Sequence, residues 1–425
     1  MLNSTTKTLS KILGLHSDNI QDVAFKDICT DTRQRMDGAI FLALIGDNFN
    51  AHDYIDTAEE MGAVAIIASQ KISSSLPVLY VADTQKALNK IAQYHLKSIQ
   101  PKIVAITGSN GKTTVKNLLA NILNIAAPTL KTQGNLNNHL GVPMTLLKLE
   151  SRHKYAVIEM GANHLGEIAH LRRIVNPDIA VVTNTGDAHI GEFGSQANLI
   201  SAKGEIYSKK SINIVNTQTE YTGEISFSPT NQKKAIGDVY ASDVDGSNFT
   251  LHTPNQQARI NLKLIGRHNI DNALAASACA HSLNIDINTI KSGLEATQAE
   301  NGRLNVIHTK QFTLIDDSYN ASPSSISAAL HTLKNFSGEL VVVLGDMAEL
   351  GTESSILHQK IGQKAQKITP HVYSVGTLAK HYQAWHFDSK AQLAKHISKN
   401  HMGATLLIKG SRIAKLDELV TLLQK

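Results

Sequence analysis

The chain has 425 residues, of which 42% are hydrophobic and 18% charged, and its formal net charge is +5. A chain of this length is expected to form about two to four domains, and the composition excludes an intrinsically disordered protein. No apolar run approaches the roughly 18 residues needed to cross a bilayer, and no signal peptide is recognisable. We therefore expect a cytoplasmic protein without membrane insertion.

The order of the predicted elements indicates an α/β protein with three domains. Residues 1–82 mix short strands and helices, with a clear strand at AIFLAL (39–44). In residues 83–303, apolar strands alternate with helices, as in a mainly parallel sheet, and a polar stretch at 225–264 suggests antiparallel strands. Residues 304–425 alternate again, which predicts a Rossmann-like α/β domain.

A glycine-rich turn stands between an apolar strand and an apolar helix face near the start of the central block. Glycines let backbone N–H groups surround an anion, and the helix N-terminus adds the positive end of its dipole. Ile106 stands where the full Walker pattern has its first glycine, so only the shorter G-x-x-G-K-T-T remains. We expect Lys112 to reach the β and γ phosphates of ATP and Thr113 to help hold Mg²⁺. The residues expected to bind ATP here are Thr107, Gly108, Ser109, Asn110, Gly111, Lys112, Thr113 and Thr114.

Three further polar residues follow predicted strands or lie on a predicted helix. Glu159 ends the apolar run YAVIE, where a carboxylate would suit Mg²⁺, a hard ion that prefers oxygen ligands. His189 follows the strand DIAVVTN and could either face the same site or be structural. On the helix pattern alone, Lys203 is interpreted as a solvated surface lysine.

Taken together, these motifs resemble the Mur ligase family, the ATP-dependent amide ligases of peptidoglycan precursor synthesis. The resemblance covers nearly the whole chain and is carried by ITGSNGKTT (106–114), GNLNNHLGVPMTLL (134–147), VIEMGANHLGEI (157–168), NTGDAHIGEFGS (184–195) and GRHNIDNALAA (266–276). Residues 30–63 look like the family's nucleotide-sugar recognition domain. One departure is Asn301, where the family usually has a proline before Gly-Arg.

The third domain resembles one branch of the family, which adds D-alanyl-D-alanine. The segments concerned are IDDSYNASPSSISAAL (315–330), VVVLGDMAELG (341–351) and IKGSR (408–412). The DYAHTP-like and DNPR text expected of the branch that adds diaminopimelate or lysine is absent, and so is the DGAHNP-like run of folylpolyglutamate synthase.

The resemblance implies a reaction and a set of roles. The γ-phosphoryl group of ATP would move to the carboxylate of UDP-N-acetylmuramoyl-tripeptide, and the D-alanyl-D-alanine amine would attack the acyl phosphate. The implied catalytic residues are Lys112, Glu159, His189 and Lys203, with Thr113, Glu159 and His189 as metal ligands. Lys203 matches a lysine that some Mur ligases carbamylate, and the sequence leaves open whether this chain does so.

The resemblance also implies binding residues in all three domains. Asn269 and Asn272 would contact adenine, and Arg303 and Asp317 would close on the nucleotide. Implied contacts to the UDP-sugar are Asp31, Thr32, Arg33, Asn137 and Asn138, and implied contacts to D-alanyl-D-alanine are Tyr319, Asn320 and Ser322. We expect a monomer whose domains close around these small-molecule substrates, shielding the acyl phosphate from water.

Other functions are weighed against this one. A sister ligase could add a different amino acid, and the diamino acid at the third peptide position is left open. The basic charge would also allow a P-loop nucleic-acid ATPase, but lysine and arginine are scattered and only 5% of residues are aromatic, so nucleic acid is not expected. An ATP sensor without catalysis is disfavoured, because Lys112, Thr113, Glu159 and His189 are all present.

Overall fold

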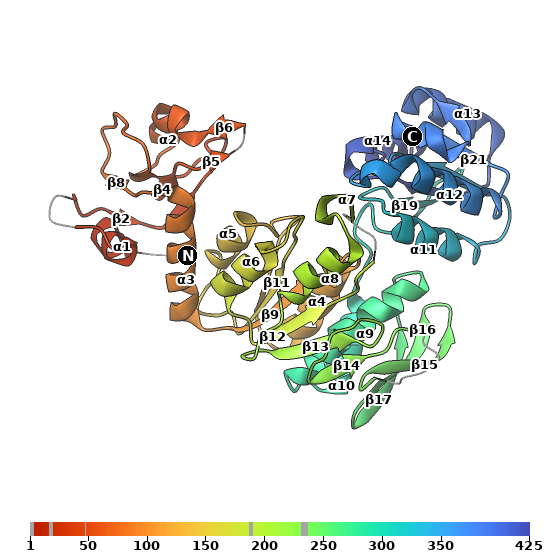
Figure 1. Ribbon diagram of the computed structural model, residues 1–425, viewed down its shortest axis with the longest axis horizontal. Helices are drawn as coiled ribbons and strands as arrows, with labels where there is room; N and C mark the ends of the chain where they lie inside the picture. The colour runs from red at the N-terminus through yellow and green to blue at the C-terminus, as the bar shows by residue number, and fades with distance from the viewer. Residues whose placement is uncertain (1–3, 17–19, 47, 187–189, 231–236) are drawn as a thin grey trace. The chain divides into compact units, whose positions relative to one another are not determined.

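The computed structural model describes residues 4–16, 20–46, 48–186, 190–230 and 237–425 (Figure 1). His189, predicted to serve a metal, therefore lies outside the described residues. The chain divides into two compact units, one of residues 1–105, 127–160 and 169–178, the other of residues 106–126, 161–168 and 179–425.

The N-terminal part of the first unit contains a four-stranded parallel sheet in the order β3-β4-β7-β8. The predicted strand at 39–44 is confirmed, although β4 ends at Leu42. The bounds are β1 (Ser4–Thr5), α1 (Thr6–Leu13), β2 (Ala24–Phe25), β3 (Asp27–Cys29), β4 (Ala39–Leu42), β5 (Ile45–Gly46), β6 (Phe49–Asn50), η1 (Ala51–Tyr54), α2 (Ile55–Glu60), β7 (Ala65–Ala68) and β8 (Val78–Tyr80).

The rest of the first unit begins with a long helix whose ends are set by local chemistry. The Asp83 side chain accepts the Lys86 N–H at the start of α3, and Gln100 ends the helix in the left-handed conformation. Strand β9 begins in this unit and ends in the second, and its sheet has the order β10-β11-β9-β12-β13-β14. The bounds are α3 (Thr84–Ile99), β9 (Lys102–Thr107), β10 (Thr129–Lys131), α5 (Gly141–Leu146), β11 (Tyr155–Glu159) and α6 (Glu167–Val175).

The second unit continues the sheet with parallel strands β12, β13 and β14 and adds three antiparallel strands, β15 to β17. The antiparallel strands expected within 225–264 are confirmed for residues 240–261, whereas residues 225–227 form a strand parallel to its neighbour. Helices α4 and α10 approach closely at Gly293. A Cβ atom there would overlap the Ile122 backbone, so this contact needs glycine. The bounds are α4 (Lys112–Ala126), β12 (Ile179–Val182), α7 (Ile190–Phe193), α8 (Gln196–Gly204), β13 (Ile212–Asn216), β14 (Ile225–Phe227), β15 (Tyr240–Asp245), β16 (Asn248–Thr253), β17 (Gln256–Asn261), α9 (Arg267–Ser282) and α10 (Ile287–Ala296).

The C-terminal part of the second unit is a six-stranded sheet in the order β18-β19-β23-β20-β21-β22, antiparallel only at β18. The strand bounds are β18 (Asn305–His308), β19 (Thr313–Asp317), β20 (Leu340–Leu344), β21 (Val372–Val375), β22 (Trp385–Phe387) and β23 (Thr405–Lys409). The helical bounds are α11 (Pro323–Leu333), η2 (Gly351–Glu353), α12 (Ser354–Gln366), η3 (Leu378–Tyr382), α13 (Lys390–Asn400), η4 (Arg412–Ala414) and α14 (Asp417–Leu423).

Alternating side chains of these strands enter two separate apolar cores. Val342 and Leu344 pack with α11 and α12, whereas Val341 and Val343 pack with α13 and α14 (Figure 1). Helices therefore cover both faces of a mainly parallel sheet, which confirms the predicted Rossmann-like α/β fold. In the described ranges, no helix is long and apolar enough to span a membrane.

Candidate active site

The predicted phosphate loop lies between the end of β9 at Thr107 and the start of α4 at Lys112. Gly108 has φ +145° and Gly111 has φ +80°, values that residues with a Cβ rarely adopt. A Cβ atom on Gly108 would overlap the Thr183 hydroxyl. Glycine is therefore required at both positions, by backbone conformation and by close packing.

Residues that follow β12 hold this loop in shape. The Thr183 hydroxyl donates to the Asn110 carbonyl over 2.6 Å. The Asn110 N–H donates to the Asn184 side chain over 3.1 Å, and the Ser109 N–H donates to the Asn184 carbonyl over 3.0 Å. The Ser109 hydroxyl donates to the Gly186 carbonyl over 2.8 Å. The loop is thus braced by the neighbouring strand end before any ligand binds.

The Lys112 ammonium folds back over its own loop. It donates to the carbonyl oxygens of Gly108 over 2.8 Å and Ser109 over 3.3 Å. Thr113, in the first turn of α4, is buried, and Thr114 is half-buried. The positive charge and the helix N-terminus therefore meet at one short loop, which is the arrangement that favours a phosphate group.

Helix α9 places two asparagines beside the loop. The Asn272 amide donates to the Asn269 side-chain oxygen over 3.0 Å, and the Asn269 amide donates to the Ile265 carbonyl over 2.7 Å. A Cβ atom on Gly111 would overlap the Asn272 side-chain oxygen. Asn272 therefore lies directly against the phosphate loop, and its predicted contact with adenine stays a prediction.

Lys203 differs from the interpretation that its helix pattern alone supports. It is only 1% exposed, so the expectation of a solvated surface lysine is wrong. Its ammonium lies 5.1 Å from the centroid of the Phe193 ring and 3.5 Å from the Ala162 carbonyl oxygen. Burial, aided by the positive charge of Lys112, lowers the pKa of Lys203 from 10.5 to about 7. An amine with a pKa near 7 is partly deprotonated at physiological pH. Only the deprotonated amine is nucleophilic, as carbamate formation requires.

Glu159 belongs to the first unit and is buried at the end of β11, not solvated. One carboxylate oxygen accepts the Asn137 amide over 2.9 Å, and the Glu159 N–H donates to the Thr132 hydroxyl over 3.0 Å. Asn138 accepts the Leu140 and Gly141 N–H groups at the start of α5. The structure therefore brings predicted substrate residue Asn137 together with predicted metal ligand Glu159.

In the N-terminal sheet region, Asp31 and Arg33 form a doubly hydrogen-bonded ion pair. The Arg33 guanidinium contacts both Asp31 oxygens, at 2.8 Å each, across a turn that also contains half-buried Thr32. The Arg33 hydrogen bonds lower the pKa of Asp31 to about 2. Arg33 is 89% exposed, so its guanidinium faces solvent while paired.

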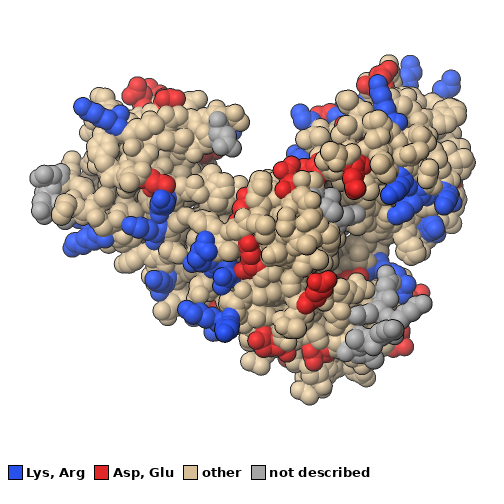
Figure 2. Space-filling view, in the orientation of Figure 1, with Lys and Arg blue, Asp and Glu red and all other residues tan. Residues whose placement is uncertain are grey.

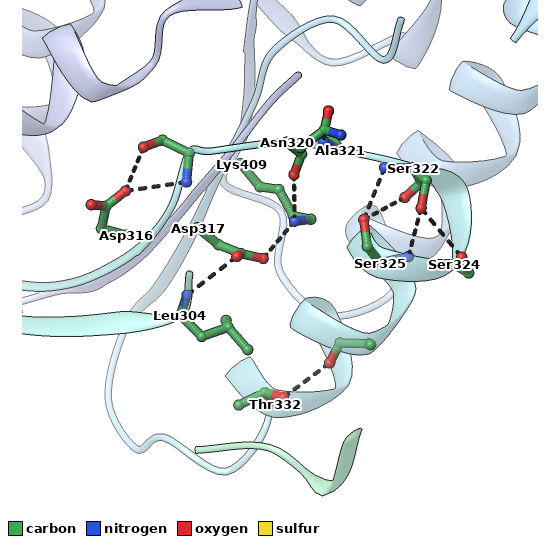
Figure 3. A network of polar contacts seen from close by, with 12 residues as sticks. Leu304, Asp316, Asp317, Asn320, Ala321, Ser322, Ser324, Ser325, Thr332 and Lys409 are labelled. Carbon is green, nitrogen blue, oxygen red and sulfur yellow. Dashed lines mark hydrogen bonds and ion pairs between the residues drawn. The ribbon is translucent and has the colours of Figure 1, made fainter. Parts of the chain in front are cut away.

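A polar network links the ends of β19 and β23 (Figure 3). The Lys409 ammonium lies 2.6 Å from one oxygen of Asp317 and donates to the Asn320 carbonyl over 2.8 Å. The other Asp317 oxygen accepts the Leu304 N–H over 3.2 Å. The sequence predicts no role for Lys409, although this lysine stands in the IKGSR segment that carries part of the family resemblance. This buried lysine fixes the loop that carries the predicted D-alanyl-D-alanine residues.

The same loop contacts the arginine predicted to close on the nucleotide. The Arg303 guanidinium lies 4.1 Å from the centroid of the Tyr319 ring, and the Tyr319 N–H donates to the Gly302 carbonyl over 3.0 Å. Ser322 caps α11, since its hydroxyl accepts the Ser325 N–H over 3.3 Å (Figure 3). Two residues predicted to contact different substrates, Arg303 and Tyr319, thus stack on each other.

Charged side chains are visible on one face of the molecule in Figure 2. On the face that Figure 2 shows, lysine and arginine side chains are interspersed with aspartate and glutamate instead of forming one continuous patch. Nucleic-acid-binding proteins typically gather basic residues along one face or helix.

Comparisons with known proteins agree with this geometry. Residues 106–280 match the Mur ligase middle domain, and residues 302–412 match the Mur ligase, glutamate ligase domain. The chain is 39% identical to UDP-N-acetylmuramoyl-tripeptide–D-alanyl-D-alanine ligase of Escherichia coli, over 98% of each chain. It superposes on MurF from Acinetobacter baumannii with a TM-score of 0.93, at 35% identity and full coverage of both chains. It superposes on MurF ligase from Thermotoga maritima in complex with ADP with a TM-score of 0.85, at 28% identity, covering 94% of this chain and 97% of that one.

Proposed function

This chain belongs to the Mur ligase family, and from that premise we propose that it joins D-alanyl-D-alanine to UDP-N-acetylmuramoyl-tripeptide at the expense of ATP. The observation that carries the proposal is full-length similarity to relatives named for that activity, across all three domains of the family's architecture. The product would be the UDP-N-acetylmuramoyl-pentapeptide of peptidoglycan synthesis.

The chemistry explains why ATP is needed. A carboxylate repels an incoming amine and offers no good leaving group. Transfer of the γ-phosphoryl group to the tripeptide carboxylate gives an acyl phosphate and ADP. The dipeptide amine then attacks the carbonyl carbon, and the tetrahedral intermediate expels inorganic phosphate and loses a proton to give the amide. The protein contributes mainly positioning and charge neutralisation.

Charge neutralisation falls to the phosphate loop. We propose that Lys112 exchanges its two loop carbonyls for the β and γ phosphates, supported by the pre-braced loop N–H groups. The Thr113 hydroxyl and the buried Glu159 carboxylate are oxygen donors, which fit Mg²⁺, and that ion would neutralise phosphate charge when bound. His189 is proposed for a second metal. Lys203, buried and with a pKa lowered to about 7, is proposed as a carbamylated metal-binding group.

The remaining proposed contacts follow the family pattern. Asn269, Asn272, Arg303 and Asp317 would hold the nucleotide, and the position of Asn272 against Gly111 supports this for Asn272. For the UDP-sugar we propose Asp31, Thr32, Arg33, Asn137 and Asn138. For D-alanyl-D-alanine we propose Tyr319, Asn320 and Ser322, in the loop that Lys409 anchors.

We also propose that the three domains comprise residues 1–82, 83–303 and 304–425, that the enzyme is a monomer, and that it acts in the cytoplasm. The family models, which begin at residue 106 and end at residue 412, support the middle and C-terminal assignments. The free thiols of Cys29 and Cys279 are consistent with a reducing compartment.

ADP release is the direct test. With Mg²⁺ and UDP-N-acetylmuramoyl-tripeptide, D-alanyl-D-alanine should trigger turnover, whereas diaminopimelate, lysine or DNA should not. Lys112→Ala should lower the rate on the order of a hundredfold or more, because the transferred phosphoryl group loses the positive charge that the Lys112 ammonium would place beside it. Lys97→Ala, on the exposed side of α3, is the matched control and should retain the parent rate. Turnover with diaminopimelate or lysine instead would identify a sister ligase, and Lys112→Ala working as well as the parent would refute the proposal.

A further inference from the structure

A second group of ionisable side chains lies at the end of the C-terminal sheet where its parallel strands begin. Among the described residues, Glu339, His371 and His401 offer three potential ligand atoms within 4.8 Å of one another. Glu339 comes directly before β20, His371 directly before β21, and His401 directly after α13. All three therefore lie where the parallel strands begin.

This position separates the group from the proposed nucleotide and substrate residues. Asp317 and Lys409 are the last residues of β19 and β23, which run parallel to β20. The two ends of a five-residue strand are roughly 15 Å apart. The cluster at the amino-terminal edge therefore takes no part in the network of Figure 3.

The distances within the cluster suit a shared ion. One Glu339 oxygen lies 2.7 Å from His401 Nδ1 and 3.3 Å from His371 Nε2. Ligands about 2.0–2.2 Å from a tetrahedral metal ion lie about 3.3 Å from each other. The centroids of the two imidazole rings lie 4.8 Å apart. One nitrogen of each ring therefore faces the same Glu339 oxygen. All three ligand atoms lie within 4.8 Å of one another, so side-chain movements of about 1 Å would bring them to the spacing of tetrahedral ligands.

A second layer of hydrogen bonds is in place to orient the buried histidine. His401 Nε2 lies 2.6 Å from the Tyr373 hydroxyl, which lies 3.3 Å from His396 Nε2. If His401 Nδ1 bound a metal, Nε2 would carry the proton and donate it to the Tyr373 oxygen, while the Tyr373 O–H would donate to His396. Metal-bound histidines characteristically have such a partner on the other ring nitrogen, which fixes the tautomer.

We propose that Glu339, His371 and His401 bind one divalent transition-metal ion, with Zn²⁺ the best match. Two imidazoles and one carboxylate are a ligand set typical of zinc, and they are unsuited to Mg²⁺, which prefers oxygen ligands. His401 is buried, His371 is half-buried and Glu339 is exposed, so solvent reaches one side and can supply a fourth ligand. The bound ion would clamp the starts of β20 and β21 to the turn after α13. It would thereby stabilise the C-terminal domain independently of nucleotide.

The test is calorimetric titration of metal-stripped, untagged full-length protein with Zn²⁺. The parent should bind an ion that His371→Ala and Glu339→Gln each weaken at least tenfold. Glu339→Gln keeps the shape of the side chain and one acceptor oxygen while removing its negative charge, so it decides the matter if His371→Ala misfolds. His308→Ala, which removes an exposed histidine from β18 of the same sheet, is the matched control and should bind Zn²⁺ as the parent does.

Two further measurements separate this site from zinc bound in place of Mg²⁺ near the nucleotide. Co²⁺ should give visible absorption bands of a tetrahedral nitrogen and oxygen site in the parent, and His371→Ala should lack them. Tyr373→Phe should weaken Zn²⁺ binding about tenfold or more by removing the hydrogen bond to His401. The proposal is overturned if the parent binds no Zn²⁺, or if His371→Ala and Glu339→Gln bind it as tightly as the parent.

Discussion

Lys203→Met should stabilise the protein at neutral pH and remove a pH-dependent part of its stability. The Lys203 side chain is 1% exposed and lies over the Phe193 ring, so the amine is held in an apolar environment. Burial first, and the Lys112 charge second, lower its pKa to about 7 from 10.5. Methionine has a similar length and shape, and it fills the same space without an ionisable group.

The sign and size of the effect follow from proton binding. Between pH 7 and 10.5 the unfolded chain holds the Lys203 proton while the folded chain has released it, so the free energy of unfolding rises with pH across that window. Each pH unit is worth about 1.4 kcal/mol, so burying the amine costs on the order of 4 kcal/mol at pH 7. That cost falls to about 1.5 kcal/mol at pH 9.5.

Urea unfolding of parent and Lys203→Met at pH 7 and pH 9.5, in buffers free of carbon dioxide, measures this directly. The advantage of the variant should shrink by about 2–3 kcal/mol between the two pH values. Lys97→Met, an exposed lysine on α3, should show no such change. An advantage that stays constant with pH, or a variant less stable than the parent at pH 7, would refute the reasoning. Ligase activity should fall in the stabilised variant, because Lys203 is proposed to act at the site.

Three other changes probe the site and its support. Gly111→Ala should weaken ADP binding at least tenfold in calorimetry, because φ is +80° there and the added Cβ would displace Asn272. Lys409→Met should lower the free energy of unfolding by about 3–5 kcal/mol, since the buried Asp317 carboxylate loses its partner 2.6 Å away. Ser322→Ala should cost about 1 kcal/mol in the same measurement, because α11 loses the side chain that caps its first turn.

Each of these has a matched control. Gly246→Ala has a similarly positive φ of +59° but open space around its Cβ, so ADP affinity should not change. Adding Asp317→Asn to Lys409→Met should recover much of the lost stability, and no recovery would contradict the ion-pair explanation. Ser327→Ala removes a hydroxyl inside α11 that donates to the Pro323 carbonyl, and a loss equal to that of Ser322→Ala would exclude the capping explanation.

The phosphate loop could be predicted from sequence because its determinants are local. Strand, glycines, Lys112 and helix follow one another within about twenty residues, so the chain order alone dictates their proximity. The α/β class was readable for the same reason, because the alternation of strands and helices is a property of short windows. Element ends were less accurate, and the strand expected at 39–44 ends at Leu42, the last residue in register with β7.

The burial of charged side chains, and their pairing with residues far away in the chain, could not be predicted from local sequence. Nothing near Lys203 in sequence distinguishes it from a surface lysine, and its lowered pKa arises from packing with Phe193 and from the charge of Lys112. The partnership of Asp317 with Lys409, and the meeting of Glu339 with two histidines, join residues that are far apart in the chain.

The fold class, the phosphate loop and the family resemblance could thus be predicted before the structure was known, since they depend on local order and on motifs. Which charged groups are buried, and which partners they meet, became known only from the packing of the sheets and helices. Desolvation and Coulomb interactions depend on distances in space, and that packing sets those distances.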